Sequence, residues 1–416
     1  MKHRHFLSAA VIGLGLGLGL VPAATPLIPP ALAAENSVRP EVGKPLQAAQ
    51  ELIKAQKYRD ALAKIHEAEE VGELTPFESG LVDQLRAGAA QGAGDFATAA
   101  KAYESLLAAG RGPAATDPLK VTQVITSLYL QAKDYGKAAS WAKRYVADGG
   151  TDPNVRNLIA QAYYQGEDYP NAVKAVQDQI KAAEQAGQPV PEAPLQILLN
   201  SENKLDDKDG YGFALEKLVT YHPKPEYWES LLHRIGARQG FPDRLQLDLD
   251  RLAQSVGTLK TTAEVVEFAE LALQAGLPGE AKAIIDKGYA DGVLGTGADA
   301  ERHKRLRDLA TKKSEEDLKT LAVAEKDAAG QPDGTGLVNT GFDYVGYGQL
   351  AKGLPLLEQG IQKGSLKRPD EAKLHLGIAY LLAGQKDKAV ATLKTVQSTD
   401  PTADLARLWI IKAKES

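Results

Sequence analysis

The chain has 416 residues, no cysteine and a net charge of −5, with 49 Lys and Arg residues against 54 Asp and Glu residues. The lack of cysteine excludes disulfides, thiolate metal sites and a cysteine-linked lipid anchor. Nucleic-acid-binding proteins rely on a basic surface, so the acidic balance predicts no nucleic-acid partner.

Residues 1–34 have the pattern of a secretory signal peptide. Lys2 and Arg4 form a basic start, residues 6–21 are apolar, and the Ala-Leu-Ala sequence at 31–33 is typical of a cleavage site. A retained N-terminal anchor is the alternative, but alternating glycines make the apolar stretch a poor membrane-spanning helix. We expect cleavage, a periplasmic or secreted location and no stable membrane insertion afterwards.

The rest of the chain has the composition of an all-α protein. Leu, Ala, Lys, Glu and Gln dominate and favour helix, whereas Gly and Pro recur as stops. Between residues 160 and 182, small and aromatic residues recur at spacings of three and four, and Asp168–Pro170 interrupts this pattern. This segment is therefore predicted to form two short antiparallel helices.

A repeat is visible in the centre of the sequence. Three residues recur at an offset of 34 positions, namely Tyr129, Tyr135 and Ala138, which return as Tyr163, Tyr169 and Ala172. A period of this length is typical of helix–turn–helix units that stack into a solenoid. Solenoids bind through extended surfaces, so the repeat favours a binding protein over an enzyme.

Near the C-terminus, seven residues match positions 7, 8, 11, 15, 20, 24 and 32 of a known repeat: Leu376, Gly377, Tyr380, Gly384, Ala389, Leu393 and Pro401. Lys373 at position 4 and Lys386 at position 17 depart from it. The chain thus resembles the tetratricopeptide repeat family. The resemblance implies an α-solenoid of stacked antiparallel helix hairpins, in which small residues at positions 8 and 20 let the paired helices approach closely.

The same register places looser hairpins over residues 35–330 and 331–416. In one of them Trp228 lies at position 4, but Arg244 replaces the small residue at position 20, so we expect a splayed hairpin. Residues 299–329 are charge-dense and are predicted to form a divergent hairpin, with Ser314 as a helix N-cap. Residues 403–414 are predicted to form a C-terminal capping helix.

The sequence offers little catalytic chemistry. The five histidines after residue 34 are far apart, and no nucleophile motif is present, so we expect no catalytic residue, metal or cofactor. Glu78 and Ser79 form the dipeptide that carries the catalytic acid in soluble lytic transglycosylases. Glu78 follows Pro76 at a predicted helix start, where a carboxylate favours the helix dipole, so we expect no enzyme.

The resemblance also implies a binding surface, because positions 2, 5, 9, 12 and 13 of each first helix commonly face the ligand in this family. The first three of these positions hold Lys120, Gln123 and Ser127 in one repeat, and the first four hold Asn154, Asn157, Gln161 and Tyr164 in the next. Spacings of three and four put each set on one helix face. Amides can pair with the backbone of an extended peptide, although an ordinary solvated face is the alternative.

These observations predict a non-catalytic periplasmic adaptor that binds a protein or extended peptide partner, within a cell-envelope complex. The alternative is a peptidoglycan- or carbohydrate-binding protein, or one similar to lytic transglycosylases. Carbohydrate binding would favour exposed aromatics along the groove, and aromatic residues make up only 6% of the chain. The sequence leaves the partner and the oligomeric state open.

Overall fold

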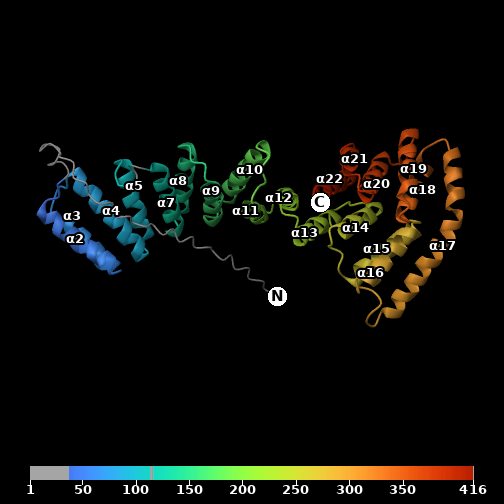
Figure 1. Cartoon of the computed structure of the whole chain (residues 1–416), viewed down its shortest axis with the longest axis horizontal. Helices are drawn as coiled ribbons and strands as arrows, with labels where there is room; N and C mark the ends of the chain where they lie inside the picture. The colour runs from blue at the N-terminus through green and yellow to red at the C-terminus, as the bar shows by residue number, and fades with distance from the viewer. Residues whose placement is uncertain (1–36, 113–114, 116, 416) are drawn as a thin grey trace. The chain divides into compact units, whose positions relative to one another are not determined.

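A computed structural model describes residues 37–112, 115 and 117–415. This part of the chain contains twenty α-helices, one 3-10 turn and no strand, which confirms the all-α prediction. The predicted signal peptide, residues 1–34, lies outside the described residues. The chain divides into two compact units, one ending at Asp134 and one beginning at Tyr135 (Figure 1). The boundary expected between residues 330 and 331 falls inside the second unit.

The first unit consists of paired helices. Its described helices are α2 (Pro40–Lys54), α3 (Tyr58–Glu69), α4 (Pro76–Ala93), α5 (Phe96–Ala108) and α7 (Pro118–Gln131). Each of α2–α3 and α4–α5 forms an antiparallel hairpin, and α7 packs on α5. Helices α4 and α7 each begin with a proline. The residue before it, Thr75 in α4 and Asp117 in α7, caps the helix by accepting a backbone hydrogen bond through its side chain.

The second unit continues the hairpin pattern. Its first helices are α8 (Tyr135–Ala147), α9 (Pro153–Gln165), α10 (Tyr169–Gln185), α11 (Glu192–Lys204), α12 (Lys208–Tyr221) and α13 (Pro225–Gly236). A 3-10 turn (Asp243–Leu245) precedes α14 (Gln246–Ser255), α15 (Thr262–Gln274), α16 (Pro278–Ala290) and α17 (Ala300–Gly330). The last helices are α18 (Thr335–Gly346), α19 (Leu350–Lys363), α20 (Pro369–Leu382), α21 (Lys386–Leu393) and α22 (Thr402–Lys414). None of the described helices combines the length and apolar character of a membrane span.

Small residues hold the hairpins together, as the register predicts. Ala160 and Ala172, at positions 8 and 20 of the α9–α10 hairpin, are both fully buried. In the α18–α19 hairpin, glycine occupies both positions. A Cβ atom added to Gly341 would lie 2.9 Å from the carbonyl oxygen of Gly353. The two backbones are therefore too close for any side chain at this point.

The prediction of a hairpin at residues 299–329 was wrong, because this segment is the single helix α17. Ser314 does not cap a helix but lies buried in the middle of one. The buried residues of α17 recur at spacings of seven and four, which gives one continuous stripe: His303, Ala310, Ser314, Leu321 and Ala328. No proline or glycine interrupts the segment before residue 330, so nothing in it forces a turn.

The final helix, α22, covers apolar surface of the preceding helices and also of helices distant in sequence. Leu405, Leu408 and Trp409 of α22 are buried. The helix packs on α20 and α21, and also against α12 and α14. The indole Nε1 of Trp228 donates a hydrogen bond to Glu415, 187 residues later, at 2.9 Å. The second unit is thus closed by contacts between its middle and its C-terminal end.

The segment after α13 shows why Arg244 departs from the repeat pattern. Its guanidinium forms ion pairs with Glu371, at 2.5 Å, and with Asp400. Nearby, Leu249 and Leu252 of α14 share one apolar core with residues of α20 and α22. The arginine therefore joins this segment to the C-terminal helices and does not fill a hairpin interior.

The close approach of α18 and α19 leads to a stability prediction. Gly341→Ala should lower the free energy of unfolding by about 1–3 kcal/mol, because the new methyl group forces two backbones apart. Gly330→Ala is the matched control, since nothing lies within 4 Å of its added Cβ. Chemical denaturation of both variants measures the difference. Equal stability of the two would contradict the packing described here.

Candidate functional site

The predicted binding residues of the second unit lie together on α9. Asn154 is exposed, and Asn157, Gln161 and Tyr164 are half-buried. The side-chain amides of the first three form no hydrogen bond with any residue that the structure describes. Tyr164 packs edge-on against Tyr169, with ring centroids 5.8 Å apart. This face, which we call the amide face, therefore presents free donors and acceptors next to an aromatic pair.

The predicted residues of the first unit lie on α7 and are more engaged with their own helix. The hydroxyl of Ser127 donates to the carbonyl oxygen of Gln123 at 3.2 Å, and Gln131 donates to that of Ser127 at 3.4 Å. Lys120 is exposed, and no ion pair of its ammonium group occurs in the described chain. The α7 face therefore has fewer free polar groups than the amide face of α9, which belongs to a different unit.

Helix α11, which packs on α9, adds residues that the sequence reasoning missed. Gln196 and Asn203 hold positions 2 and 9 of its repeat. Gln196 donates to Glu192 at 3.1 Å and to the hydroxyl of Tyr227 at 2.9 Å, whereas Asn203 is exposed. Tyr211 holds position 17 of this repeat, and counting back from it gives both residues. However, α10 has 17 residues where α8 has 13, and this longer helix breaks the 34-residue period there and hides the correspondence.

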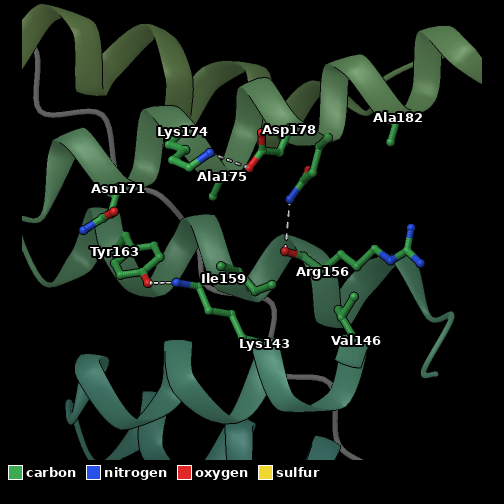
Figure 2. A pocket seen from close by; sticks show the side chains of 11 residues that line it. Lys143, Val146, Arg156, Ile159, Tyr163, Asn171, Lys174, Ala175, Asp178 and Ala182 are labelled. Atoms are coloured by element: carbon green, nitrogen blue, oxygen red, sulfur yellow. Dashed lines mark hydrogen bonds and ion pairs between the residues drawn. The ribbon is translucent and has the colours of Figure 1, made fainter. Parts of the chain in front are cut away.

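A cavity of about 420 Å³ lies between α8, α9 and α10 (Figure 2). Eleven residues line it: Lys143, Val146, Arg156, Ile159, Tyr163, Asn171, Lys174, Ala175, Asp178, Gln179 and Ala182. On α9 these lining residues alternate with those of the amide face, so one helix contributes to two different surfaces. None of the seven predicted binding residues lines the cavity.

The cavity exists because one packing position is unusual. Arg156 stands at position 4 of its repeat, where the family has a bulky apolar residue, and its side chain is exposed. The amide of Gln179 donates to the backbone oxygen of Arg156 at 3.0 Å, across the cavity. A large apolar side chain at this position would occupy the space between the two helices. The long, charged side chain of arginine instead reaches solvent.

Glu78 does not have the environment of a catalytic acid. Its side chain is fully buried, and its carboxylate accepts hydrogen bonds from the guanidinium of Arg39, at 2.8 Å, and from the backbone of Thr75, at 2.9 Å. The hydrogen bonds from Arg39 are the largest cause of a pKa lowered to about 2. A general acid needs a raised pKa, so this residue serves as a helix cap. Within the described residues, no group of His, Asp and Glu has the arrangement of a metal site.

The second unit also contains a buried charge cluster that fixes α14. The guanidinium of Arg251 pairs with Asp248 at 2.6 Å and with Glu280 of α16 at 2.7 Å. It also lies 4.7 Å from the ring centroid of Phe342 in α18. His375 of α20 contacts Asp248 at 2.9 Å. Every charge in this cluster has a partner, so it is built to join helices and not to bind a ligand.

Asp343 of α18 lies at the edge of this cluster and has an unusual pKa. Burial is the main cause, and the charges of Asp317 and Glu280 add to it, so that the pKa is raised to about 7. One of its carboxylate oxygens is buried without a hydrogen-bond partner. The folded protein therefore holds a proton that the unfolded chain releases at lower pH.

The sign of this shift gives a pH prediction. A raised pKa stabilises the fold below about pH 4, and this contribution is lost as the pH rises through about 7. Asp343→Asn keeps the side chain neutral, so its stability relative to the natural chain should rise by about 1–3 kcal/mol between pH 4 and pH 8. Denaturation across this range measures it, with the exposed Asp387→Asn as control. A constant difference across the range would show that folding does not raise the pKa of Asp343.

A family model matches one repeat of the chain. Residues 371–403 match the tetratricopeptide repeat model, and no curated protein matches the sequence. Among solved structures, the TPR2AB domain of yeast Sti1 in complex with pHSP90 is 13% identical, with 71% of this chain and 98% of that chain covered and a TM-score of 0.25.

Two other solved structures show the same degree of likeness. Naa15/Naa10 bound to HypK is 15% identical, with 88% and 59% covered and a TM-score of 0.29. Yeast Tom70 is 11% identical, with 90% and 96% covered and a TM-score of 0.22. At these TM-scores the structures carry no conclusion about partners. Residues 371–403 thus match a tetratricopeptide repeat, and the helix hairpins of the described chain, with small residues at the expected positions, resemble this family, whose architecture suits protein–protein interaction scaffolds.

Proposed function

We propose that this chain is a non-catalytic adaptor of the cell envelope, and that it binds an extended segment of a partner protein along the amide face of α9. The proposal rests on one observation. Asn154, Asn157 and Gln161 project from one helix face, and their side-chain amides form no hydrogen bond with any described residue. A row of free amides on a rigid helix is an arrangement that can recognise peptide backbone, because each amide both donates and accepts.

The spacing of these amides suits an extended chain. Side chains three and four residues apart on a helix have Cβ atoms roughly 5–6 Å apart. In an extended peptide, backbone groups on the same side recur every second residue, at roughly 6.6 Å. Neighbouring amides of α9 can therefore pair with successive backbone groups of one bound strand. The peptide ligand needs no particular side chain for these contacts.

Charge and aromatic content of the face indicate the kind of segment that fits. Helix α9 carries one charged residue, Arg156, and this residue belongs to the cavity and not to the amide face. The face is therefore neutral and does not select a charged ligand. Tyr164 and Tyr169 add an apolar contact at its C-terminal end. An uncharged extended segment with an apolar residue at one end is the ligand that this arrangement supports best.

The envelope location rests on the N-terminal sequence. A basic start, an apolar stretch and a small-residue cleavage pattern support export. A cysteine-free chain is also compatible with an oxidising compartment. Within such a compartment, the chain would hold other proteins together.

A paired substitution tests the amide face. Asn157→Ala with Gln161→Ala should weaken binding of the partner about tenfold or more, because each net hydrogen bond contributes about 0.5–1.5 kcal/mol. Both side chains are partly solvent-accessible, so the melting temperature should barely change. The control is Gln177→Ala with Gln185→Ala, which removes two exposed amides from α10. Affinity capture from an envelope extract, quantified for all three chains, gives the comparison.

The same experiment decides between protein and carbohydrate ligands. Partner proteins retained by the natural chain and by the control, but lost from the paired variant, would support the proposal. If no protein is retained while muropeptides raise the melting temperature, the protein-adaptor proposal is wrong. Carbohydrate binding would then be the function of the chain.

A further inference from the structure

We infer that the cavity between α8, α9 and α10 is a second binding site, and that it takes an acidic, partly apolar segment of a partner protein. The inference does not depend on the amide face. It rests on three properties of the cavity: its volume, its charges and its apolar lining (Figure 2).

The cavity has the size and lining of a binding site. Its volume of about 420 Å³ lies within the range of roughly 300–1,000 Å³ seen for ligand pockets. Val146 of α8, Ile159 of α9 and Ala175 of α10 give it an apolar part. Burial of apolar side chains of a ligand against these residues would supply favourable free energy.

The charged groups around the cavity favour an anionic ligand. Each of the three helices contributes one cation, namely Lys143, Arg156 and Lys174. The cavity has one carboxylate, Asp178, and this pairs with Lys174 at 3.2 Å. A local excess of positive charge on a chain whose net charge is −5 is a feature of this surface and not of the molecule as a whole.

Arg156 is the group best placed to bind a carboxylate. Its guanidinium forms no ion pair in the part of the chain that the structure describes, and it extends from α9 beside the cavity (Figure 2). Arginine binds carboxylates through two parallel hydrogen bonds. By contrast, the ammonium group of Lys143 already contacts the hydroxyl of Tyr163 and lies 4.9 Å from that ring centroid.

The dimensions favour a peptide segment over a small anion. The lining residues of α10 run from Asn171 to Ala182, which spans roughly 16 Å at 1.5 Å per residue. A free anion would leave the apolar residues uncovered. A segment that alternates acidic and apolar side chains would satisfy Arg156 and cover Ile159 and Ala175 together.

The test uses the full chain after signal cleavage and two labelled peptides, one of alternating Glu and Leu and one of alternating Lys and Leu. Fluorescence anisotropy should show tighter binding of the Glu–Leu peptide, and this binding should weaken as salt is added. Equal affinity for both peptides, or no binding of the acidic one, would overturn the inference.

Two substitutions place the binding in the cavity. Arg156→Leu removes the cation and fills the space, whereas Ala175→Phe fills the space and keeps every charge. Each should weaken binding of the Glu–Leu peptide about tenfold or more, while Lys181→Leu, which removes an exposed cation of α10 outside the cavity, should not. If Arg156→Leu and Ala175→Phe bind as tightly as Lys181→Leu, the peptide binds elsewhere and the inference is wrong.

A melting measurement keeps this test independent of folding. Arg156→Leu puts an apolar residue where the repeat normally has one, so its melting temperature should equal or exceed that of the natural chain. Should Ala175→Phe unfold, Arg156→Gln supplies a second variant that removes the charge at similar size. A loss of peptide binding in a fully folded Arg156→Gln chain supports the inference, and its retention there contradicts it.

Discussion

The close approach of the two helices in each hairpin is the constraint on which the rest of this structure depends. Small residues at positions 8 and 20, such as Ala160 with Ala172 or Gly341 with Gly353, are buried at these contacts. Because they face the partner helix, the residues on the other faces are left for contacts outside the hairpin. The faces considered for binding are therefore a consequence of packing inside the repeat.

The two ends of the second unit use those outer faces differently. On α20, positions 5 and 9 hold Leu374 and Ile378, which are buried in one apolar core with α14 and α22. On α9, the same positions hold Asn157 and Gln161, whose side chains form no hydrogen bond with any described residue. The C-terminal repeats thus bury their first-helix face within the chain, with Arg251 and its partners holding α14 in place. The face on α9 is not buried in this way, and it is the face that we propose for another protein.

Most of the repeat architecture could be predicted from the sequence, because packing positions recur locally. The residues that echo Tyr129 and Tyr135 34 positions later, Tyr163 and Tyr169, lie in the α9–α10 hairpin that the structure contains. Three features could not be predicted in this way. Helix α17 has no turn, although Ser314 suggested the start of a second helix there. Helix α22 packs on helices far away in sequence. The cavity depends on the direction of one side chain, Arg156. The last of these left a trace in the sequence, a charged residue at a position for bulky apolar ones.

The central claim is that a partner polypeptide lies on the amide face of α9. A photo-reactive side chain placed at position 161 tests it most directly, with the same group at position 177 on α10 as the reference. In cells that export the chain, irradiation should give a discrete protein adduct from position 161 and little or none from position 177. Adducts of equal yield from both positions, or an adduct from position 177 alone, would contradict the account.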